Sequence, residues 1–299
     1  MTITMTGNRS ITANYAALQY TVTLSSSPAY GTTSGGGTSS YGSSVTINAT
    51  PTVTGSEFTR WTENGSTVSY NASYTFTLSA DRTLIAHFGQ AQVDLGTTAS
   101  NFAILAGAGV TDAGGSHVYG DVGSDPTPTI SGLTAAQVSG ILYTAVDPIV
   151  ETAKSDLNTA YNNAQGRSLD KITLAANLGG STLAPGLYTN SSSSGISGIG
   201  PNAILTLDAG GDSNAVWIFQ MGSTLITDAG TSIVLANGAQ WKNIYWSVGT
   251  SATLGTNSIF YGNILADQSI TITTGAKLFG RALTRVAAVT MDTDIIDKR

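Results

Sequence analysis

The feature that most constrains the fold is a short pattern that recurs four times in the last third of the chain. Each copy contains three apolar segments separated by Gly, Asn or Asp, and the equivalent positions Ile244, Ile264 and Ala282 are 20 and 18 residues apart. Repeats of this length with several short strands per turn are typical of β-solenoids, whose coils stack on one another. The pattern therefore predicts a β-solenoid that aligns equivalent residues in flat rows.

The second apolar segment of each coil alternates between apolar and small residues. In residues 269–273, Ile270 and Ile272 are expected to point inward and the residues between them outward. Rungs about 4.8 Å apart and outward residues about 6.6 Å apart along each strand would form a grid of hydroxyl and methyl groups with almost no charge. Such a grid suits a flat, repetitive ligand. Its predicted outward residues are Thr224, Ile226, Thr253, Ser269, Thr271, Thr273, Ala288 and Thr290.

One helix is predicted within this otherwise β-rich region. Asp147 is a good N-cap, Pro148 suits the first helical position, and Gly166 is expected to end the helix. The first apolar segment of each coil does not alternate, so it should be covered on both sides, and the helix is the obvious cover. The apolar stripe predicted to pack on these strands consists of Ile149, Ala153, Leu157, Ala160, Tyr161 and Ala164.

The composition excludes several classes of protein. Only 10% of the 299 residues are charged and the net charge is -6, which argues against nucleic acid as a partner. Cysteine is absent, so disulfides and thiolate chemistry are excluded. No apolar run is long enough to span a membrane, so no membrane insertion is expected. We expect neither a cofactor nor a metal.

The first part of the chain has a different organisation. Residues 3–15 match residues 76–88 in spacing, which suggests that the chain begins in the tail of one module and then contains a complete one; a chance match in Thr-rich sequence is the alternative. Three alternating segments predict an all-β module, with a Gly/Ser loop at residues 31–42. The predicted boundaries are 1–16 for the tail, 17–89 for the module and 93–299 for the solenoid, with a linker at 89–92.

The complete module resembles the bacterial cell-surface repeat of Listeria-type internalins. Phe58, Trp61, Ala86 and Phe88 carry this resemblance. It implies a spacer or stalk, with Trp61 in the core and not in a sugar-stacking platform. No signal peptide is visible in the first residues. We expect export signals and tandem modules to precede the chain in a larger protein, at the cell surface or outside the cell.

Convergent catalytic groups are not apparent. The motifs of serine hydrolases, dinucleotide-binding proteins and P-loop proteins are absent. A β-helix polysaccharide lyase remains as an enzyme alternative, for which Asp267 and Arg285 are the nearest pair, although a surface salt bridge explains them more simply. Asp208 and Asp212 flank a turn that could hold calcium. A polysaccharide-binding adhesin is a second alternative, with Trp241 and Tyr261 as its candidate aromatic residues.

Residues from about 93 to 296 resemble the microbial ice-binding proteins of the DUF3494 type. The resemblance rests on the segments LGTTASNFAILA (95–106), GDVG (120–123), LAPGLY (183–188), LTLDA (205–209), AVWIFQ (215–220), NGAQ (237–240), NILA (263–266) and GRAL (280–283). It implies an all-β fold with one long helix, namely a discontinuous three-faced β-solenoid with the helix packed along one face. It also implies that the second-strand face binds an ice crystal, inhibits ice growth and recrystallisation, and includes Ala108 and Thr111 from the first coil.

Overall fold

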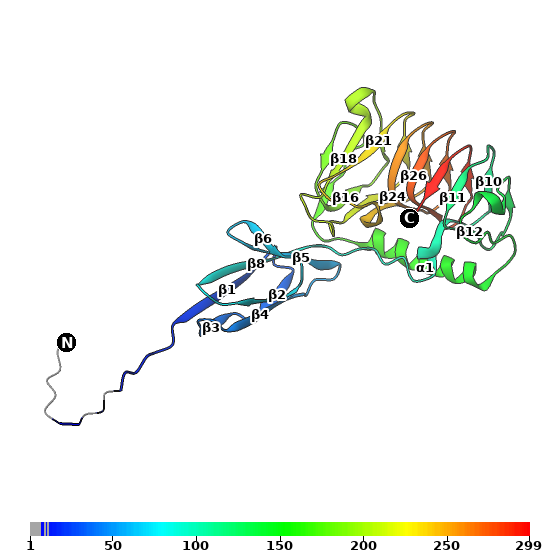
Figure 1. Ribbon diagram of the computed structural model, residues 1–299. Helices are drawn as coiled ribbons and strands as arrows, with labels where there is room; N and C mark the ends of the chain where they lie inside the picture. Colours follow the sequence, from blue (N-terminus) through cyan, green and yellow to red (C-terminus); the bar gives the residue numbers. More distant parts are fainter. Residues whose placement is uncertain (1–6, 9, 11) are drawn as a thin grey trace. The chain divides into compact units, whose positions relative to one another are not determined.

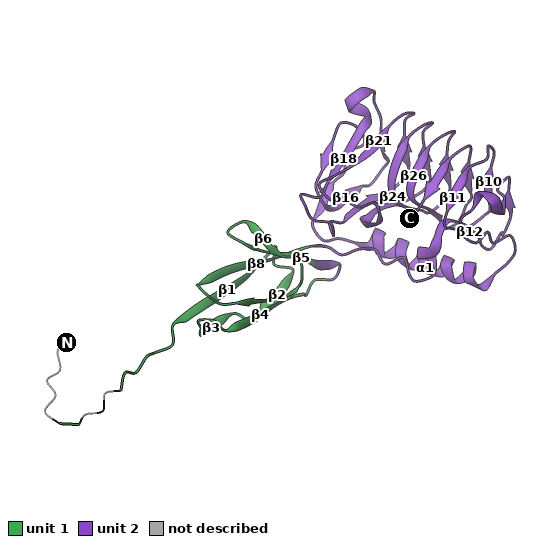
Figure 2. Ribbon diagram, in the orientation of Figure 1, with its two compact units in different colours: residues 1–53, 58–88 green, residues 54–57, 89–299 purple. Residues whose placement is uncertain are grey.

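The computed structural model describes every residue except 1–6, 9 and 11, and the chain separates into two compact units (Figures 1 and 2). One unit comprises residues 1–53 and 58–88, and the other comprises residues 54–57 and 89–299. Much of the predicted module tail at residues 1–16 lies outside the described residues. The described residues 7, 8, 10 and 12–18 have no assigned helix or strand.

The N-terminal unit consists of two small β-sheets, as the alternating segments predict. The prediction of a loop at residues 31–42 is wrong, because two short strands lie there and pair with strands on either side. The five-stranded sheet has the order β3 (Gly37–Ser40), β1 (Gln19–Ser27), β8 (Arg82–Gln90), β5 (Ser56–Glu63) and β6 (Ser66–Ser69). The second sheet has the order β2 (Gly31–Ser34), β4 (Ser44–Pro51) and β7 (Ser73–Thr77).

Trp61 is the centre of the apolar core of this unit. Its side chain is fully buried with Ala86 and Phe88, and its ring contacts Phe58 at a centroid distance of 5.7 Å. The indole Nε1–H donates to the carbonyl oxygen of Ala72. The expectation that Trp61 is a core residue agrees with this burial.

The second unit is a three-faced β-solenoid, which confirms the predicted fold class. One face, called the grid face below, is a seven-stranded parallel sheet. Its order is β13 (Ile130–Ser131), β10 (Val110–Asp112), β27 (Val289–Met291), β25 (Ile270–Ile272), β23 (Ala252–Leu254), β20 (Leu225–Thr227) and β17 (Ser194–Ile196).

The other two faces belong to one continuous sheet that bends around a corner. The helix face contains β14 (Lys171–Thr173), β16 (Gly186–Asn190), β19 (Trp217–Met221), β22 (Ile244–Val248), the second halves of β24 (Ile259–Ala266) and β26 (Lys277–Thr284), β9 (Phe102–Ala106) and β12 (Asp121–Ser124). The third face contains β15 (Thr182–Leu183), β18 (Ile204–Asp208), β21 (Ser232–Ala236), the first halves of β24 and β26, β28 (Ile295–Asp297) and β11 (His117–Tyr119). Short 3-10 turns are η1 (Ala99–Asn101), η2 (Ala135–Gln137), η3 (Gly200–Ala203) and η4 (Trp241–Asn243).

The corner between these two faces depends on glycine. Gly262 and Gly280 are register partners in the middle of β24 and β26, with φ of 119° and 151°. A Cβ on Gly280 would lie 1.9 Å from the carbonyl oxygen of Gly262. Only glycine therefore allows both strands to turn the corner while stacked in register.

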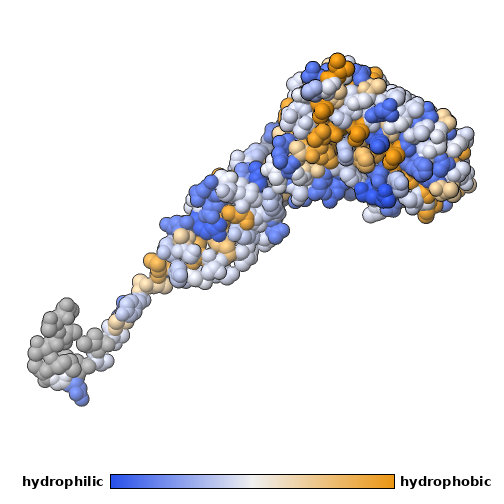
Figure 3. Space-filling view, turned by 45° about the horizontal axis from the view of Figure 1, so that its top comes forward, coloured by the Kyte–Doolittle hydropathy of each residue, from blue (hydrophilic) through white to orange (hydrophobic). Residues whose placement is uncertain are grey.

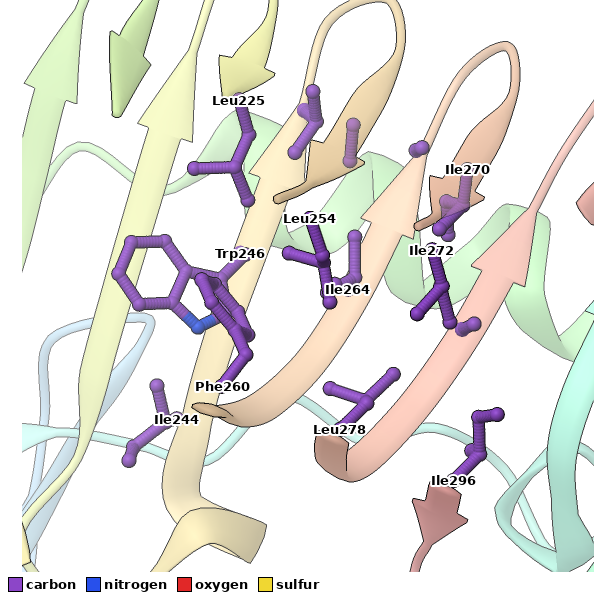
Figure 4. Close-up of a cluster of buried hydrophobic side chains, with 14 of the residues drawn as sticks. Leu225, Ile244, Trp246, Leu254, Phe260, Ile264, Ile270, Ile272, Leu278 and Ile296 are labelled. Atoms are coloured by element: carbon purple, nitrogen blue, oxygen red, sulfur yellow. The ribbon is translucent and has the colours of Figure 1, made fainter. Parts of the chain in front are cut away.

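The coils are discontinuous in sequence. The first coil stacks on the last one, because β9 pairs with β26, β10 with β27 and β11 with β28. The coil spacing also differs from the predicted one: Ile264 is level with Trp246 and not with Ile244, so the last coils are 18 residues long. Bulky side chains from all three faces fill the interior, including Trp246, Phe260 and Leu278 (Figure 4).

Helix α1 (Pro148–Gly166) covers the helix face, as predicted (Figure 1). The Asp147 carboxylate accepts a hydrogen bond from the Ile149 amide at 2.8 Å, which caps the first turn. The predicted stripe is wrong at its first position, since Ile149 is 48% exposed and Val150 is buried instead. Residues of the helix pack against two rows of side chains on this face, namely Leu187, Ile218 and Tyr245, and Leu265, Leu283 and Leu105.

The buried helix surface includes a lysine that the pattern does not predict. The Lys154 ammonium donates to the carbonyl oxygens of Thr284 and Arg285, the latter at 2.8 Å. These carbonyl groups lie at the end of β26, and Lys154 supplies them with hydrogen-bond donors in place of a neighbouring strand. Burial lowers the pKa of Lys154 to about 8.

Candidate functional site

The grid face presents one central row of small side chains along the solenoid. In six of the seven strands the middle residue points outward, because its two neighbours are buried in the solenoid interior. The seventh strand, β13, has two residues and contributes Ser131. Strand pairing places these residues in direct register. In spatial order the row is Gly195, Ile226, Thr253, Thr271, Thr290, Thr111 and Ser131.

Four of these residues form an uninterrupted run of threonines. The hydroxyl groups of Thr253, Thr271, Thr290 and Thr111 make no hydrogen bond to any residue that the structure describes, so they remain free for water. Ile226 extends the row with an apolar side chain that is 50% exposed. At a rung spacing of about 4.8 Å, the run places a methyl and a hydroxyl group on each of four successive rungs.

A flanking row lies two residues earlier in each coil and is more constrained. The Thr224 hydroxyl donates to the Ser193 hydroxyl at 2.8 Å, and the Ser269 hydroxyl donates to the Ser251 hydroxyl at 2.9 Å. These contacts between rungs fix the side chains before any ligand arrives. Ala288 continues the row with a methyl group.

The opposite edge of the grid is less uniform. The Thr273 hydroxyl donates to the Leu254 carbonyl oxygen at 2.8 Å and is therefore satisfied within the protein. Its counterparts in neighbouring coils include Asp228, which is exposed, and Asp292, which accepts a hydrogen bond from the Thr274 hydroxyl at 2.6 Å. The uncharged area is thus the central row and the flanking row.

Eight of the ten predicted site residues lie within the central and flanking rows, Thr273 lies at the opposite edge, and Ala108 lies outside the grid. Ala108 is exposed and precedes β10. Because Val110 pairs with Val289, the residue level with Ala288 is Gly109, and Ala108 lies one residue before that position. The alternation within each strand predicts the outward orientation of Ile226, Thr253, Thr271 and Thr290, which the structure shows in register. The prediction missed Ser131, Thr129, Ser193 and Ser251. Ser131 and Thr129 belong to a coil that does not follow the repeat spacing. Ser193 and Ser251 each lie one residue before a strand begins.

The residues considered for catalysis or metal binding have structural partners. Arg285 forms an ion pair with Asp267 at 2.8 Å and also donates to the Asn158 side chain. The Asp208 carboxylate accepts from the Gly210 amide and the Asn237 side chain, and these bonds lower its pKa. Among the described residues, no group of three or more acidic or histidine side chains is arranged to hold a metal ion.

The aromatic residues considered for polysaccharide binding lie away from the grid face. Tyr261 lies on the third face, where its ring stacks on Phe279 at 4.9 Å. Trp241 lies in η4, and the Arg281 guanidinium sits over its ring at 5.2 Å. In the part of the chain that the structure describes, no helix has the length and apolar character needed to cross a membrane.

Together, the discontinuous coils, the covering helix and the uncharged threonine row define a β-solenoid with one flat, hydroxyl-rich binding face. The family described as "Ice-binding-like" matches residues 104–297. An ice-binding protein of Nostoc sp. (strain HG1) is 43% identical over 205 residues, covering 68% of this chain and 74% of that protein. One from Flavobacterium frigoris (strain PS1) is 38% identical, covering 65% of this chain and 72% of that protein. The chain belongs to the ice-binding-like family.

Solved structures agree with this assignment. The crystal structure of an ice-binding protein from an Antarctic biological consortium has a TM-score of 0.65 and 42% identity, covering 69% of this chain and 91% of that chain. The DUF3494 domain of Shewanella frigidimarina ice-binding protein 1 has a TM-score of 0.63 and 28% identity, covering 70% and 98%. The divergent InlB B-repeat domain family matches residues 20–92, which supports the resemblance inferred for the N-terminal module.

Proposed function

We propose that this chain binds ice through the grid face, and that the central row Thr253, Thr271, Thr290 and Thr111 is the main contact. The observation that carries the proposal is the unbroken run of four threonines on a rigid parallel sheet, with hydroxyl groups that bond to no described residue. The similarity to ice-binding proteins, which extends over most of the solenoid, supports the same ligand.

The proposed mechanism is adsorption. Methyl groups are weakly hydrated, so water over the row is easily reorganised, while the hydroxyl groups anchor waters at fixed intervals. The flanking hydroxyl pairs reduce side-chain freedom and therefore the entropy lost on binding. Ice that grows between adsorbed molecules is curved, and its growth and recrystallisation are disfavoured. No chemical step is needed.

The other two faces are less suited to ice. Helix α1 covers the helix face. The third face carries Lys277, Asp297 and Arg299, whose charges order water tightly and break any flat apolar pattern. The grid face is the one whose exposed rows are small and uncharged.

The experiment is growth of a single ice crystal in dilute protein during slow cooling. The wild-type chain should produce facets and hold growth within a temperature gap, and Thr271→Tyr should abolish both because the ring lifts the face off the crystal. The matched control is Thr206→Tyr, which adds the same ring to an outward, half-buried position on the third face. Round crystals with the wild-type chain, or equal activity in both variants, would reject the grid face.

We further propose that the protein acts outside the cell or at its surface and that the N-terminal module is a spacer. The match to the InlB B-repeat domain and the placement of Trp61 in the core support a spacer. Surface labelling of intact cells with an antibody to the solenoid tests the location. Protection of the epitope until lysis would contradict it. We also propose that further repeat modules precede this one in a larger protein, and sequencing the gene upstream of the codon for residue 1 tests this.

A further inference from the structure

The third face carries a row of aromatic side chains that the ice-binding role does not use. Strand pairing aligns Tyr261 with Phe279, Phe279 with Asp297, and Asp297 with Tyr119 on four successive strands. The row therefore runs along the solenoid axis for about 14 Å. Tyr261, Phe279 and Tyr119 are each partly exposed. These three residues, with Asp297 between them, are called the aromatic strip.

The acidic residue within the aromatic strip is neutralised. Arg299 donates to both carboxylate oxygens of Asp297, at 3.0 and 2.8 Å, and its guanidinium lies 3.7 Å from the centre of the Tyr119 ring. The side chain of Arg299 is 63% exposed, so part of its donor fork still faces solvent. Asp297 and Arg299 therefore neutralise each other, and the charge of the neighbouring lysines is not offset by Asp297.

Cations border the aromatic strip on both sides. Lys277 is exposed on β26, two residues before Phe279, and so lies on one side of the aromatic strip. Lys298 directly follows Asp297 and lies next to Gly120, on the other side. Neither lysine forms an ion pair with a described residue, and neither does Lys242, which is exposed beside Trp241. Arg281 adds a further positive charge. Burial, together with the charge of Arg281, lowers the pKa of Lys298, while the charge of Asp121 opposes this shift.

This clustering is unusual for the chain as a whole. Lys242, Lys277, Arg281, Lys298 and Arg299 are five of its 12 Lys and Arg residues, although the net charge is -6. Figure 3 shows apolar and strongly hydrophilic residues lying next to one another on the solenoid surface. Exposed Val234 and Ile259 belong to the same third face.

We propose that the aromatic strip and its bordering lysines bind an acidic polysaccharide, lying along the solenoid axis. A linear polyuronate presents apolar C–H faces that pack on aromatic and aliphatic side chains, and a carboxylate on each sugar that pairs with ammonium groups. Both partners are one-dimensional repeats, so several weak contacts add along their length. The grid face stays free, and the protein can then hold a polysaccharide and ice on different faces.

The test is affinity electrophoresis of the full chain in gels that contain alginate, with dextran as the neutral probe. Alginate should retard the wild-type chain at low salt and lose this effect at high salt, whereas dextran should not retard it. Lys277→Gln should weaken the association about threefold, and the double variant Lys277→Gln/Lys298→Gln about tenfold, since ion pairs of exposed or half-buried lysines are individually weak. Ice shaping should be unchanged in both variants, which also shows that they fold.

The matched control is Lys171→Gln, because Lys171 is an exposed lysine on β14 at the other end of the solenoid and the change in net charge is the same. It should bind alginate like the wild-type chain. Equal weakening by Lys171→Gln, absence of retardation by alginate, or equal retardation by dextran would overturn the proposal. If the chain sediments with phosphatidylglycerol vesicles and does not bind alginate, the proposal is overturned and the ligand is a lipid surface.

Discussion

Thr111 and Thr290 are register partners on adjacent parallel strands, although they come from the first and last coils of the solenoid. The pairing of β10 with β27 extends the threonine row by one rung and joins it to Ser131 on β13. Without this closure, the row would end at Thr290 on an exposed strand edge. The discontinuous fold therefore both protects the edge and lengthens the uncharged surface.

The contribution of the first coil can be tested at Thr111. Thr111→Tyr should remove most ice-shaping activity, as Thr271→Tyr should, because a ring at either rung prevents close approach of the whole face. The thermal midpoint should change little, since Thr111 is exposed and its hydroxyl has no described partner. Thermal hysteresis and circular dichroism are the two measurements. Full activity of Thr111→Tyr would restrict the ice contact to the other coils.

The packing of α1 predicts different costs for two similar truncations. Leu157→Ala should lower the free energy of unfolding by about 2–5 kcal/mol, because Leu157 is fully buried between the helix and the sheet. Ile149→Ala is the control and should cost less than about 1 kcal/mol, since Ile149 is largely in solvent. Urea denaturation followed by tryptophan fluorescence measures both. Similar costs would mean that the apolar stripe begins at Ile149 after all.

The corner glycines predict a backbone effect. Gly280→Ala should destabilise the solenoid by about 3 kcal/mol or more, because the added Cβ meets the Gly262 carbonyl oxygen and the residue has a positive φ. Gly230→Ala is the matched control: its φ is also positive, at 70°, but nothing lies near the added Cβ, so about 1 kcal/mol is expected. Differential scanning calorimetry separates the two. Equal costs would show that the close approach between strands relaxes easily.

Asp294 predicts that stability depends on pH. Burial raises the pKa of its carboxyl group to about 7, with Asp292 and Asp112 adding repulsion, while hydrogen bonds from the amides of Ala276 and Asp292 oppose the rise. The folded state therefore retains a proton that the unfolded state releases near its ordinary pKa of 3.8. The resulting stabilisation is complete below that pKa and is lost as pH rises through about 7.

The expected size of this effect is on the order of 4 kcal/mol between pH 4 and pH 8, since each unit of the pKa shift corresponds to about 1.4 kcal/mol. The urea concentration at the unfolding midpoint of the wild-type chain should fall as pH rises from 4 to 8, after allowance for the other titrating groups. Asp294→Asn should flatten that part of the curve, because it removes the titration, while losing one of the two amide contacts at every pH. A wild-type slope that persists unchanged in Asp294→Asn would assign the titration to a different group.

The local periodicities in the sequence determined much of the structure. Alternation in residues 269–273 identified which side chains point outward, because the period of a strand is a property of its own backbone. Asp147 and Pro148 identified the start of α1, since capping also depends on adjacent residues. The same short-range rules placed Ile149 in the buried stripe, and there they failed: a buried position depends on the partner surface, which begins opposite Val150.

Only the tertiary structure decided which coils are neighbours. Register between Trp246 and Ile264, and closure of Thr111 onto Thr290, arise from pairing between strands that are distant in the chain, and loops of unequal length hide that pairing from any fixed repeat. The same pairing placed Tyr119 beyond Phe279 on the third face, on a strand two rungs away. The sequence by itself determined which residues each coil presents to solvent; stacking of the coils decided which of them form a continuous surface, because backbone hydrogen bonds between strands carry no trace in the order of the residues.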